Sequence, residues 1–423
     1  LAPDSVKLRT QLAMGHLALG ETDEAIGELE SAVELDQGLL QADLLLVMSY
    51  LRNRDFDNAL TSAGALKTKM PDSPVPDNLK GAAQLGQGDR KAARKSYESA
   101  LAIQPDFVPA HINLAQLDLL ENDAAAAEGH YRKALSFDEG NLKALTALAA
   151  LATHQGQADQ AEQWLKQAHR HHPDATPPAL ALVAHYQRHG NTLEALDIAR
   201  KTALSQPRDP QVLKTLAHAQ LQAGEEKEAL ATLRSLVEVA PQSAEAHYQL
   251  ALMQAKLKKS KESRAGLEKA LALQPDYPAA QLALGRLDIK ARNFDAALNT
   301  AKDLKNAHPD AAYGHELEGD IAYSRREFEQ AAAAYAIAAA KAGSTALATK
   351  LFRSRLKAGE QDAAYQGLRE WLAVHPEDSR LRTALAMALH RAGEEQAAMQ
   401  EYLKVLEYDA DNVNVLNNLA WLY

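Results

Sequence analysis

Three histidines in the segment AHRHHPD, residues 168–174, have the type and spacing closest to a chemical site. His169, His171 and His172 could bind zinc if they converged with a further ligand. The segment also ends a stretch expected to be helical, where a cation is favoured by the helix dipole. A structural or surface role therefore stands beside the metal hypothesis. We predict no metal and no cofactor.

A basic segment, KLKKSKESR at residues 256–264, stands out in an otherwise acidic chain. Its position predicts a solvated turn between helices, and contact with an anionic polymer or headgroup is the alternative. The sequence contains no nucleotide-binding glycine loop, no nucleophile elbow and no HExxH helix. We therefore predict that the chain is not an enzyme.

Composition restricts the classes of partner. The chain has 423 residues, 46% of them hydrophobic and 24% charged, with a formal net charge of −10. This negative charge argues against a nucleic-acid partner, because phosphates are bound by an excess of Lys and Arg. No run of 18 apolar residues is present, so no transmembrane segment is predicted. The absence of cysteine excludes disulfides and cysteine-ligated zinc.

Prolines recur at a fixed interval, the one that separates Pro71 from Pro105. Successive members of the series are one or two such intervals apart: Pro71, Pro105, Pro173, Pro207, Pro241, Pro275 and Pro309. The next marker, Pro376, comes just before two further intervals are complete, so one repeat near Gly343 is one residue short. Proline cannot continue a helix but tolerates an extended link, so each one predicts a helix end and a new start.

Small residues keep the same interval in each of two expected helices. One series is Ala13, Gly81, Ala115, Ala149, Ala217, Ala251, Gly285, Gly319 and Ala386. The other runs from Ala25 and Ala59 through Ala127 to Ala398. Between the two helices a glycine recurs, as at Gly20 and Gly88, where a left-handed residue would end the first helix. The small residues predict that neighbouring helices approach closely.

The pattern resembles that of the tetratricopeptide repeat family, and SYESALAIQPD (96–106) and HYRKALSFDEG (130–140) are similar to its second-helix signature. A helix pair buries its apolar stripe only by stacking on neighbours. We therefore predict an all-α fold, a right-handed superhelical α-solenoid of about twelve 34-residue helix-turn-helix repeats in one domain, 1–423. The expected repeats are 6–39, 40–73, 74–107, 108–141, 142–175, 176–209, 210–243, 244–277, 278–311, 312–344, 345–378 and 379–412, with part of another at 413–423.

The resemblance also implies a groove lined by positions 2, 5, 9 and 12 of each first helix, which share one helical face. Over the first four repeats these positions form an apolar wall that includes Met14, Leu44, Met48, Ile112 and Leu119. Neighbouring helices could cover this wall, or an apolar or helical partner segment could bind it.

The groove positions of repeats nine to eleven are polar, and include Arg286, Tyr313, Glu316, Asp320, Tyr323 and Arg353. Two tyrosines, two carboxylates and flanking arginines could hold a polar peptide or a sugar chain. A solvated face with local ion pairs is the alternative.

Some segments of the sequence show a resemblance that is more specific than the repeat signature. Segments such as GHELEGDIAYSRREFEQAAAAY (314–335) and NVLNNLAWLY (414–423) resemble the tetratricopeptide lipoproteins of exosortase/PEP-CTERM exopolysaccharide systems. That resemblance implies a periplasmic, lipid-anchored protein whose partners are proteins of the envelope export or sorting machinery. A cytoplasmic location is the alternative. Both ends of the sequence look like cuts, so we expect a fragment of a longer protein.

Two function classes follow, with a third in the background. The first is a non-catalytic interaction scaffold for exopolysaccharide synthesis and export or for exosortase protein sorting. The second is a groove that binds polysaccharide or peptide directly, with Tyr313 and Tyr323 as stacking platforms. The third is the recognition arm of an enzyme whose catalytic domain lies outside this sequence.

Overall fold

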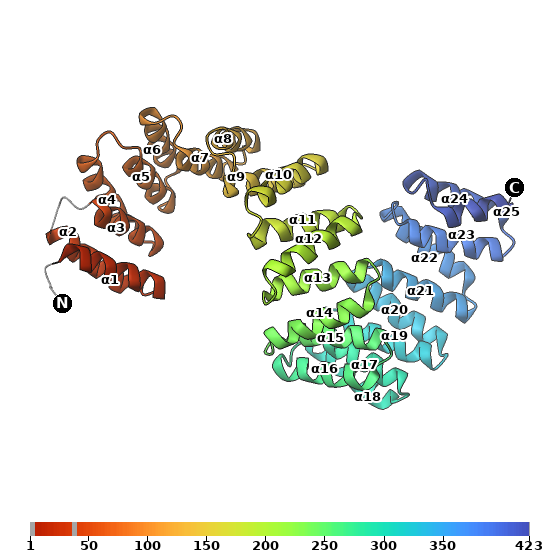
Figure 1. The fold of residues 1–423 in the computed structure, drawn as a ribbon. Coiled ribbons are helices and arrows are strands. Elements are labelled where there is room, and N and C mark those ends of the chain that lie inside the picture. The colour runs from red at the N-terminus through yellow and green to blue at the C-terminus, as the bar shows by residue number, and fades with distance from the viewer. Residues whose placement is uncertain (1–4, 36–39, 423) are drawn as a thin grey trace. The chain divides into compact units, whose positions relative to one another are not determined.

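All regular secondary structure is α-helical in residues 5–35 and 40–422, the ranges that the computed structural model describes (Figure 1). In these ranges twelve helix pairs follow one another, each joined by a tight turn, and a single helix comes after the last pair. The predicted all-α fold of stacked helix-turn-helix units is therefore confirmed. The end of the first predicted repeat, at residues 36–39, lies outside the described residues.

The chain divides into two compact units, residues 1–207 and 208–423. The first unit contains α1 (Val6–Leu19), α2 (Thr22–Leu35), α3 (Leu40–Arg52), α4 (Phe56–Lys69), α5 (Val75–Gly86), α6 (Arg90–Ile103), α7 (Val108–Leu120), α8 (Ala124–Phe137), α9 (Leu142–His154), α10 (Ala158–His171), α11 (Thr176–Arg188) and α12 (Thr192–Ser205). The second contains α13 (Pro210–Gln222), α14 (Glu226–Val239), α15 (Ala244–Lys256), α16 (Ser260–Leu273), α17 (Pro278–Lys290), α18 (Phe294–Ala307), α19 (Tyr313–Ser324), α20 (Phe328–Ala342), α21 (Thr345–Ala358), α22 (Gln361–Val374), α23 (Ser379–Arg391), α24 (Glu395–Tyr408) and α25 (Val413–Leu422). The continuity of the two units as one domain stays a prediction.

The turn inside each pair is set by one residue in the left-handed region. Gly20, with a φ of 84°, is the residue that ends α1, and its backbone N–H caps the helix. Arg54 takes the same conformation with a φ of 60° where a glycine is missing. The second helix then starts at a capping side chain in several pairs: Asp89 accepts from the Ala92 N–H at 2.9 Å.

Proline defines the other end of the pair. α4 ends at Lys69, and Met70 follows with a φ of −130° and a ψ of 64° before Pro71. Met70 therefore lies outside the helical region, which is disfavoured for the residue before a proline. The repeat that is one residue short has no proline at this place. There α20 ends at Gly343, with a φ of 54°, and the next residue, Ser344, caps α21.

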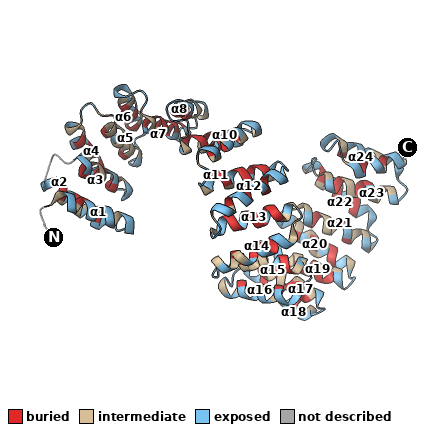
Figure 2. Cartoon of the chain, viewed as in Figure 1, coloured by how far each residue is buried: buried red, intermediate tan, exposed pale blue. Residues whose placement is uncertain are grey.

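The small residues lie where helices touch. Ala25 and Ala127 have no exposed surface. At Gly81 an added methyl carbon would lie 2.5 Å from the Tyr97 ring, so even alanine is too large at this site. Buried residues accordingly occupy the helix faces turned toward neighbouring helices, and exposed residues the outward faces (Figure 2).

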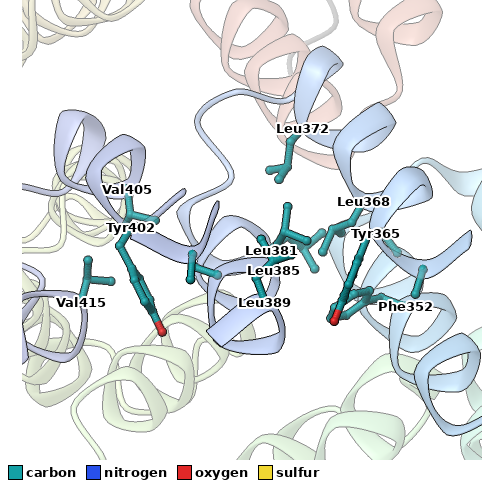
Figure 3. Packing of buried hydrophobic residues seen from close by; sticks show 14 of the residues in the cluster. Phe352, Tyr365, Leu368, Leu372, Leu381, Leu385, Leu389, Tyr402, Val405 and Val415 are labelled. Atoms are coloured by element: carbon teal, nitrogen blue, oxygen red, sulfur yellow. The ribbon is translucent and has the colours of Figure 1, made fainter. Parts of the chain in front are cut away.

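The core continues from pair to pair within a unit. In the second unit one cluster passes through five consecutive helices, from Phe352 in α21 and Leu368 in α22 to Leu385, Tyr402 and Val415 (Figure 3). Each fully buried leucine contributes about 1.5–3 kcal/mol relative to an exposed one. Because no single pair encloses the cluster, the stability of each pair depends on its neighbours.

One substitution at two glycines tests this packing. Gly81→Ala should lower the free energy of unfolding by about 1–3 kcal/mol, since the methyl group must displace the buried Tyr97 ring. Gly129→Ala, in α8 where nothing lies within 4 Å, should raise it by about 0.5–1 kcal/mol through helix propensity. Urea denaturation of both variants would measure the pair, and equal effects of the same sign would contradict the packing described.

Candidate binding groove

The apolar residues predicted for the first unit's groove differ in exposure. Met14 in α1 and Met48 in α3 are 48% and 51% exposed, and Leu119 in α7 is 37% exposed. Leu44 is half-buried. Ile112 is only 5% exposed and packs into a core cluster with residues of α8 and α9, so it does not present its side chain at the surface.

Three of the polar residues predicted for the second unit, Arg286, Glu316 and Asp320, contact one another across two neighbouring first helices. The Arg286 guanidinium of α17 donates to Asp320 at 2.9 Å and to Glu316 at 2.5 Å, both on α19. Lys350 of α21 donates to the same two carboxylates, at 2.6 Å to Asp320 and 2.8 Å to Glu316. Two cations and two carboxylates thus alternate from helix to helix, and we call these four residues the charge ladder.

Tyr335, from the second helix of the pair α19 and α20, contacts two residues of the charge ladder. The Tyr335 hydroxyl of α20 donates to Asp320 at 2.7 Å, and the Lys350 ammonium lies 5.4 Å from the centre of the Tyr335 ring. The ring fills the space over Gly319, where an added methyl carbon would lie 2.5 Å away. The same small-residue contact that packs α19 on α20 therefore positions the hydroxyl.

Partial burial makes these charges interdependent. Burial alone would raise the pKa of Asp320, but Lys350 and Arg286 outweigh it and hold that pKa below its ordinary value. Burial likewise would lower the pKa of Arg286, and the charges of Asp320 and Glu316 raise it instead. Burial and the adjacent carboxylate raise the pKa of Tyr335, so its hydroxyl remains a donor.

Beside the charge ladder lies a small cavity of about 180 Å³, lined by Asp320, Tyr323, Tyr335, Lys350 and Arg353. Arg353 is exposed and makes no hydrogen bond or ion pair with any residue that the structure describes. Tyr323 packs edge-on against Phe328, with ring centres 5.3 Å apart, and Tyr313 on α19 is 37% exposed. The carboxylates are thus occupied within the chain, while one guanidinium and two phenols stay available to a partner.

A second polar run continues on the preceding first helices of the same unit. Glu245 of α15 accepts from Tyr277 at 2.6 Å and lies 3.4 Å from the Lys214 ammonium of α13. Gln249 donates to Glu245 at 2.5 Å, and the rings of Tyr248 and Tyr277 lie 5.0 Å apart. Charged and aromatic side chains therefore line first helices from α13 to α21.

Sequence reasoning missed Lys350 and Tyr335. A signal for Lys350 was present, because it follows Glu316 by one repeat length, as Asp320 follows Arg286. Opposite charges one repeat apart face each other on neighbouring first helices. Tyr335 shares its place in the repeat with the buried Tyr97, and no feature of the sequence indicates the contact of its hydroxyl with Asp320.

Three residues of the other chemical candidates have partners within the chain. His172 has its Nε2 atom 2.5 Å from the Gly140 carbonyl oxygen. In the basic segment 256–264, Lys256 pairs with Glu226 at 2.9 Å and Arg264 with Asp288 at 2.6 Å. Across residues 5–35 and 40–422, no three His, Cys, Asp or Glu residues gather as a metal site requires, and no helix is long and apolar enough to cross a bilayer.

Scaffolds built as a solenoid of helix pairs are generally non-catalytic. Two family models described as tetratricopeptide repeat match the chain, one at 118–186 and 258–321, the other at 10–74, 78–142 and 349–414. The chain belongs to the tetratricopeptide repeat family. A model described as anaphase-promoting complex, cyclosome, subunit 3 also matches residues 188–270.

Two curated relatives each match about a third of the chain. Cellulose synthase operon protein C of Xanthomonas axonopodis pv. citri (strain 306) is 31% identical over 138 residues, 33% of this chain and 8% of that protein. Protein O-mannosyl-transferase TMTC1 of Homo sapiens is 29% identical over 139 residues, 32% of this chain and 16% of that protein. The matched regions are thus a small part of each relative's length.

Among solved structures, the crystal structure of yeast Tom70 has a TM-score of 0.52 to this chain at 13% identity. The match covers 99% of this chain and 95% of Tom70. At this identity the likeness shows the shared fold alone.

Removing one carboxylate tests the charge ladder. Asp320→Asn should lower the free energy of unfolding by about 1–3 kcal/mol at neutral pH, because two cations then share Glu316. The pKa of Asp320 is lower in the folded chain, so its charge stabilises the fold above the unfolded pKa of about 4. This stabilisation is lost as the pH falls through the folded pKa.

Urea denaturation should therefore show that the difference between the wild type and Asp320→Asn shrinks below about pH 4. Asp303→Asn, at an exposed site on α18, is the matched control and should change stability little at any pH. A difference for Asp320→Asn that stays constant with pH would contradict an ionic role.

Proposed function

We propose that the chain is a non-catalytic scaffold that holds protein partners of an envelope machinery for exopolysaccharide synthesis and export or for exosortase sorting. One observation carries the binding part of this proposal. The charge ladder satisfies Glu316 and Asp320 within the chain and leaves Arg353 and Tyr323 beside a cavity, with no polar partner among the described residues. The groove is thereby rigid before a partner binds, which lowers the entropy lost on association.

The available groups define the partner's chemistry. Arg353 presents a guanidinium, which pairs best with a carboxylate in a bidentate contact. Tyr313 and Tyr323 offer aromatic faces and hydroxyl groups, a combination that suits binding surfaces. A segment of a partner protein with an acidic side chain next to apolar or flat groups fits this surface.

Two sequence similarities support the proposed biological setting. The name of the bacterial relative places that protein in a cellulose synthase operon, and it matches this chain over 138 residues. The segments that resemble lipoproteins of exosortase/PEP-CTERM systems point the same way. We infer from these a periplasmic location with a lipid anchor elsewhere in the full protein.

Site-specific photo-crosslinking in the organism that encodes the chain would test the proposal. A photoreactive amino acid in place of Tyr323 should capture a protein of exopolysaccharide synthesis, export or sorting, identified by mass spectrometry. The same amino acid in place of Ile337, 46% exposed on α20 of the same pair, is the control and should not capture it.

Charge reversal gives the second arm of the experiment. Arg353→Glu should reduce the crosslink at position 323 by about tenfold, equivalent to about 1.4 kcal/mol for a charged contact. Lys357→Glu, also exposed on α21, should leave it unchanged. Capture only of proteins unrelated to the envelope would refute the proposed setting, and a glycan adduct would favour direct polysaccharide binding.

A further inference from the structure

A groove of about 400 Å³ lies on the second helices α8 and α10 of the first unit, apart from the first-helix groove described above. Its volume is within the range of small-ligand sites. It is lined by Arg132, Leu135, Ser136 and Glu139 from α8 and the link after it, and by Trp164, Gln167, Arg170 and His171 from α10. Six of these eight side chains are polar, and Leu135 and Trp164 supply the apolar surface.

The polar groups of this groove are available. Glu139, Gln167 and Arg170 make no hydrogen bond or ion pair with any residue in the described ranges. Arg132 uses its Nε atom on Glu128 at 2.7 Å, which leaves its two terminal nitrogens. Carboxylate, amide and guanidinium groups therefore surround one tryptophan.

The tryptophan is held in position. Trp164 is half-buried and packs against the core cluster that contains Leu135 and Ala168. The Arg132 guanidinium lies 5.2 Å from the centre of its ring, within range of a cation–π contact. An aromatic ring fixed in this way loses little conformational entropy when a ligand stacks on it.

The fold builds the same groove again in the second unit, with different chemistry. A second groove, of about 430 Å³, lies on α22 and α24. Eight of its lining residues occupy the same repeat positions as the lining of the first groove, seven repeats later: Arg369, Leu372, Ala373, Pro376, Glu401, Lys404, Glu407 and Tyr408. Arg382 lines the second groove in addition. Glu401 stands in the place of Trp164, and it pairs with Arg382 at 2.9 Å and with Lys404 at 3.1 Å.

The comparison separates fold from function. The two grooves use the same repeat positions, one with its central polar groups paired inside the chain and one with an aromatic ring among unpaired groups. The repeat therefore accommodates residues other than Trp164, Gln167 and Arg170 at these positions. Unpaired planar polar groups around a fixed aromatic ring are the features that a ligand uses.

We propose that the groove of Trp164 binds an oligosaccharide of neutral β-linked pyranose units. A pyranose with equatorial hydroxyls has a flat C–H face that packs on an aromatic ring, and its hydroxyls pair with amide, carboxylate and guanidinium groups. Arg132 is balanced by its ion pair with Glu128, and Arg170 and Glu139 carry opposite charges. The charges of these four groups cancel, so the groove favours a neutral ligand over a polyanion. A peptide would need apolar pockets for its side chains, and this groove has only one leucine beside the tryptophan.

The inference is independent of the scaffold proposed above, because the residues that carry the two belong to different units and different helix faces. Loss of protein capture at Tyr323 would leave this site untouched. Failure of sugar binding would equally leave the protein partner in place.

Isothermal titration calorimetry of the whole chain with cellohexaose, mannohexaose and chitohexaose would test the proposal. At least one of these neutral hexasaccharides should bind saturably, and Trp164→Ala should weaken that binding by about tenfold or more. Gln167→Ala and Arg170→Ala, which leave the core intact, should each weaken it several-fold. Glu407→Ala, the position equivalent to Arg170 in the second groove, is the control and should have no effect.

Three results would overturn the proposal. The first is that none of the three hexasaccharides binds the folded wild-type chain. The second is that binding occurs but is unchanged in both Gln167→Ala and Arg170→Ala, which places it elsewhere even if Trp164→Ala fails to fold by circular dichroism. The third is that an oligogalacturonate or a peptide binds the wild-type chain more tightly than the neutral hexasaccharides do, and that Trp164→Ala weakens that binding.

Discussion

The close approach of helices at alanine and glycine is the contact from which the other features of each unit follow. A helix pair has an apolar stripe on both sides, and it is covered only when neighbouring backbones come near enough for side chains such as Tyr97 to lie over a glycine. Larger residues at these sites would separate the helices. Since the contact recurs from repeat to repeat, side chains one repeat apart on neighbouring first helices can become neighbours, as Arg286 and Asp320 do.

The charge ladder is a consequence of that alignment. Arg286 and Asp320, like Glu316 and Lys350, are one repeat apart and meet because their helices are packed in register. Partly buried ion pairs of this kind add modestly to stability but fix the geometry of their surroundings. The paired charges therefore fix the shape of the groove. Unpaired charges such as Arg353 remain available at its surface.

Repetition also provides an internal comparison. The grooves around Trp164 and Glu401 share their positions in the repeat and their approximate size, and they differ in chemistry. Fold membership in the tetratricopeptide repeat family explains the shape of both. Binding specificity lies in residues that the repeat leaves free to vary, which is why scaffolds of one fold serve many partners.

The sequence by itself determined the helix pairs, their turns and their buried small residues, because proline, left-handed glycine and alanine act through local backbone rules that do not depend on distant contacts. It also indicated that Arg286, Glu316 and Asp320 occupy groove positions of successive first helices. Only the tertiary structure decided that these three satisfy one another, that Lys350 and Tyr335 join them, and that Ile112 belongs to the core. The physical reason is that pairing and burial depend on the distances between side chains of different helices. The repeat period predicts which face of a helix a residue occupies, and it does not predict those distances.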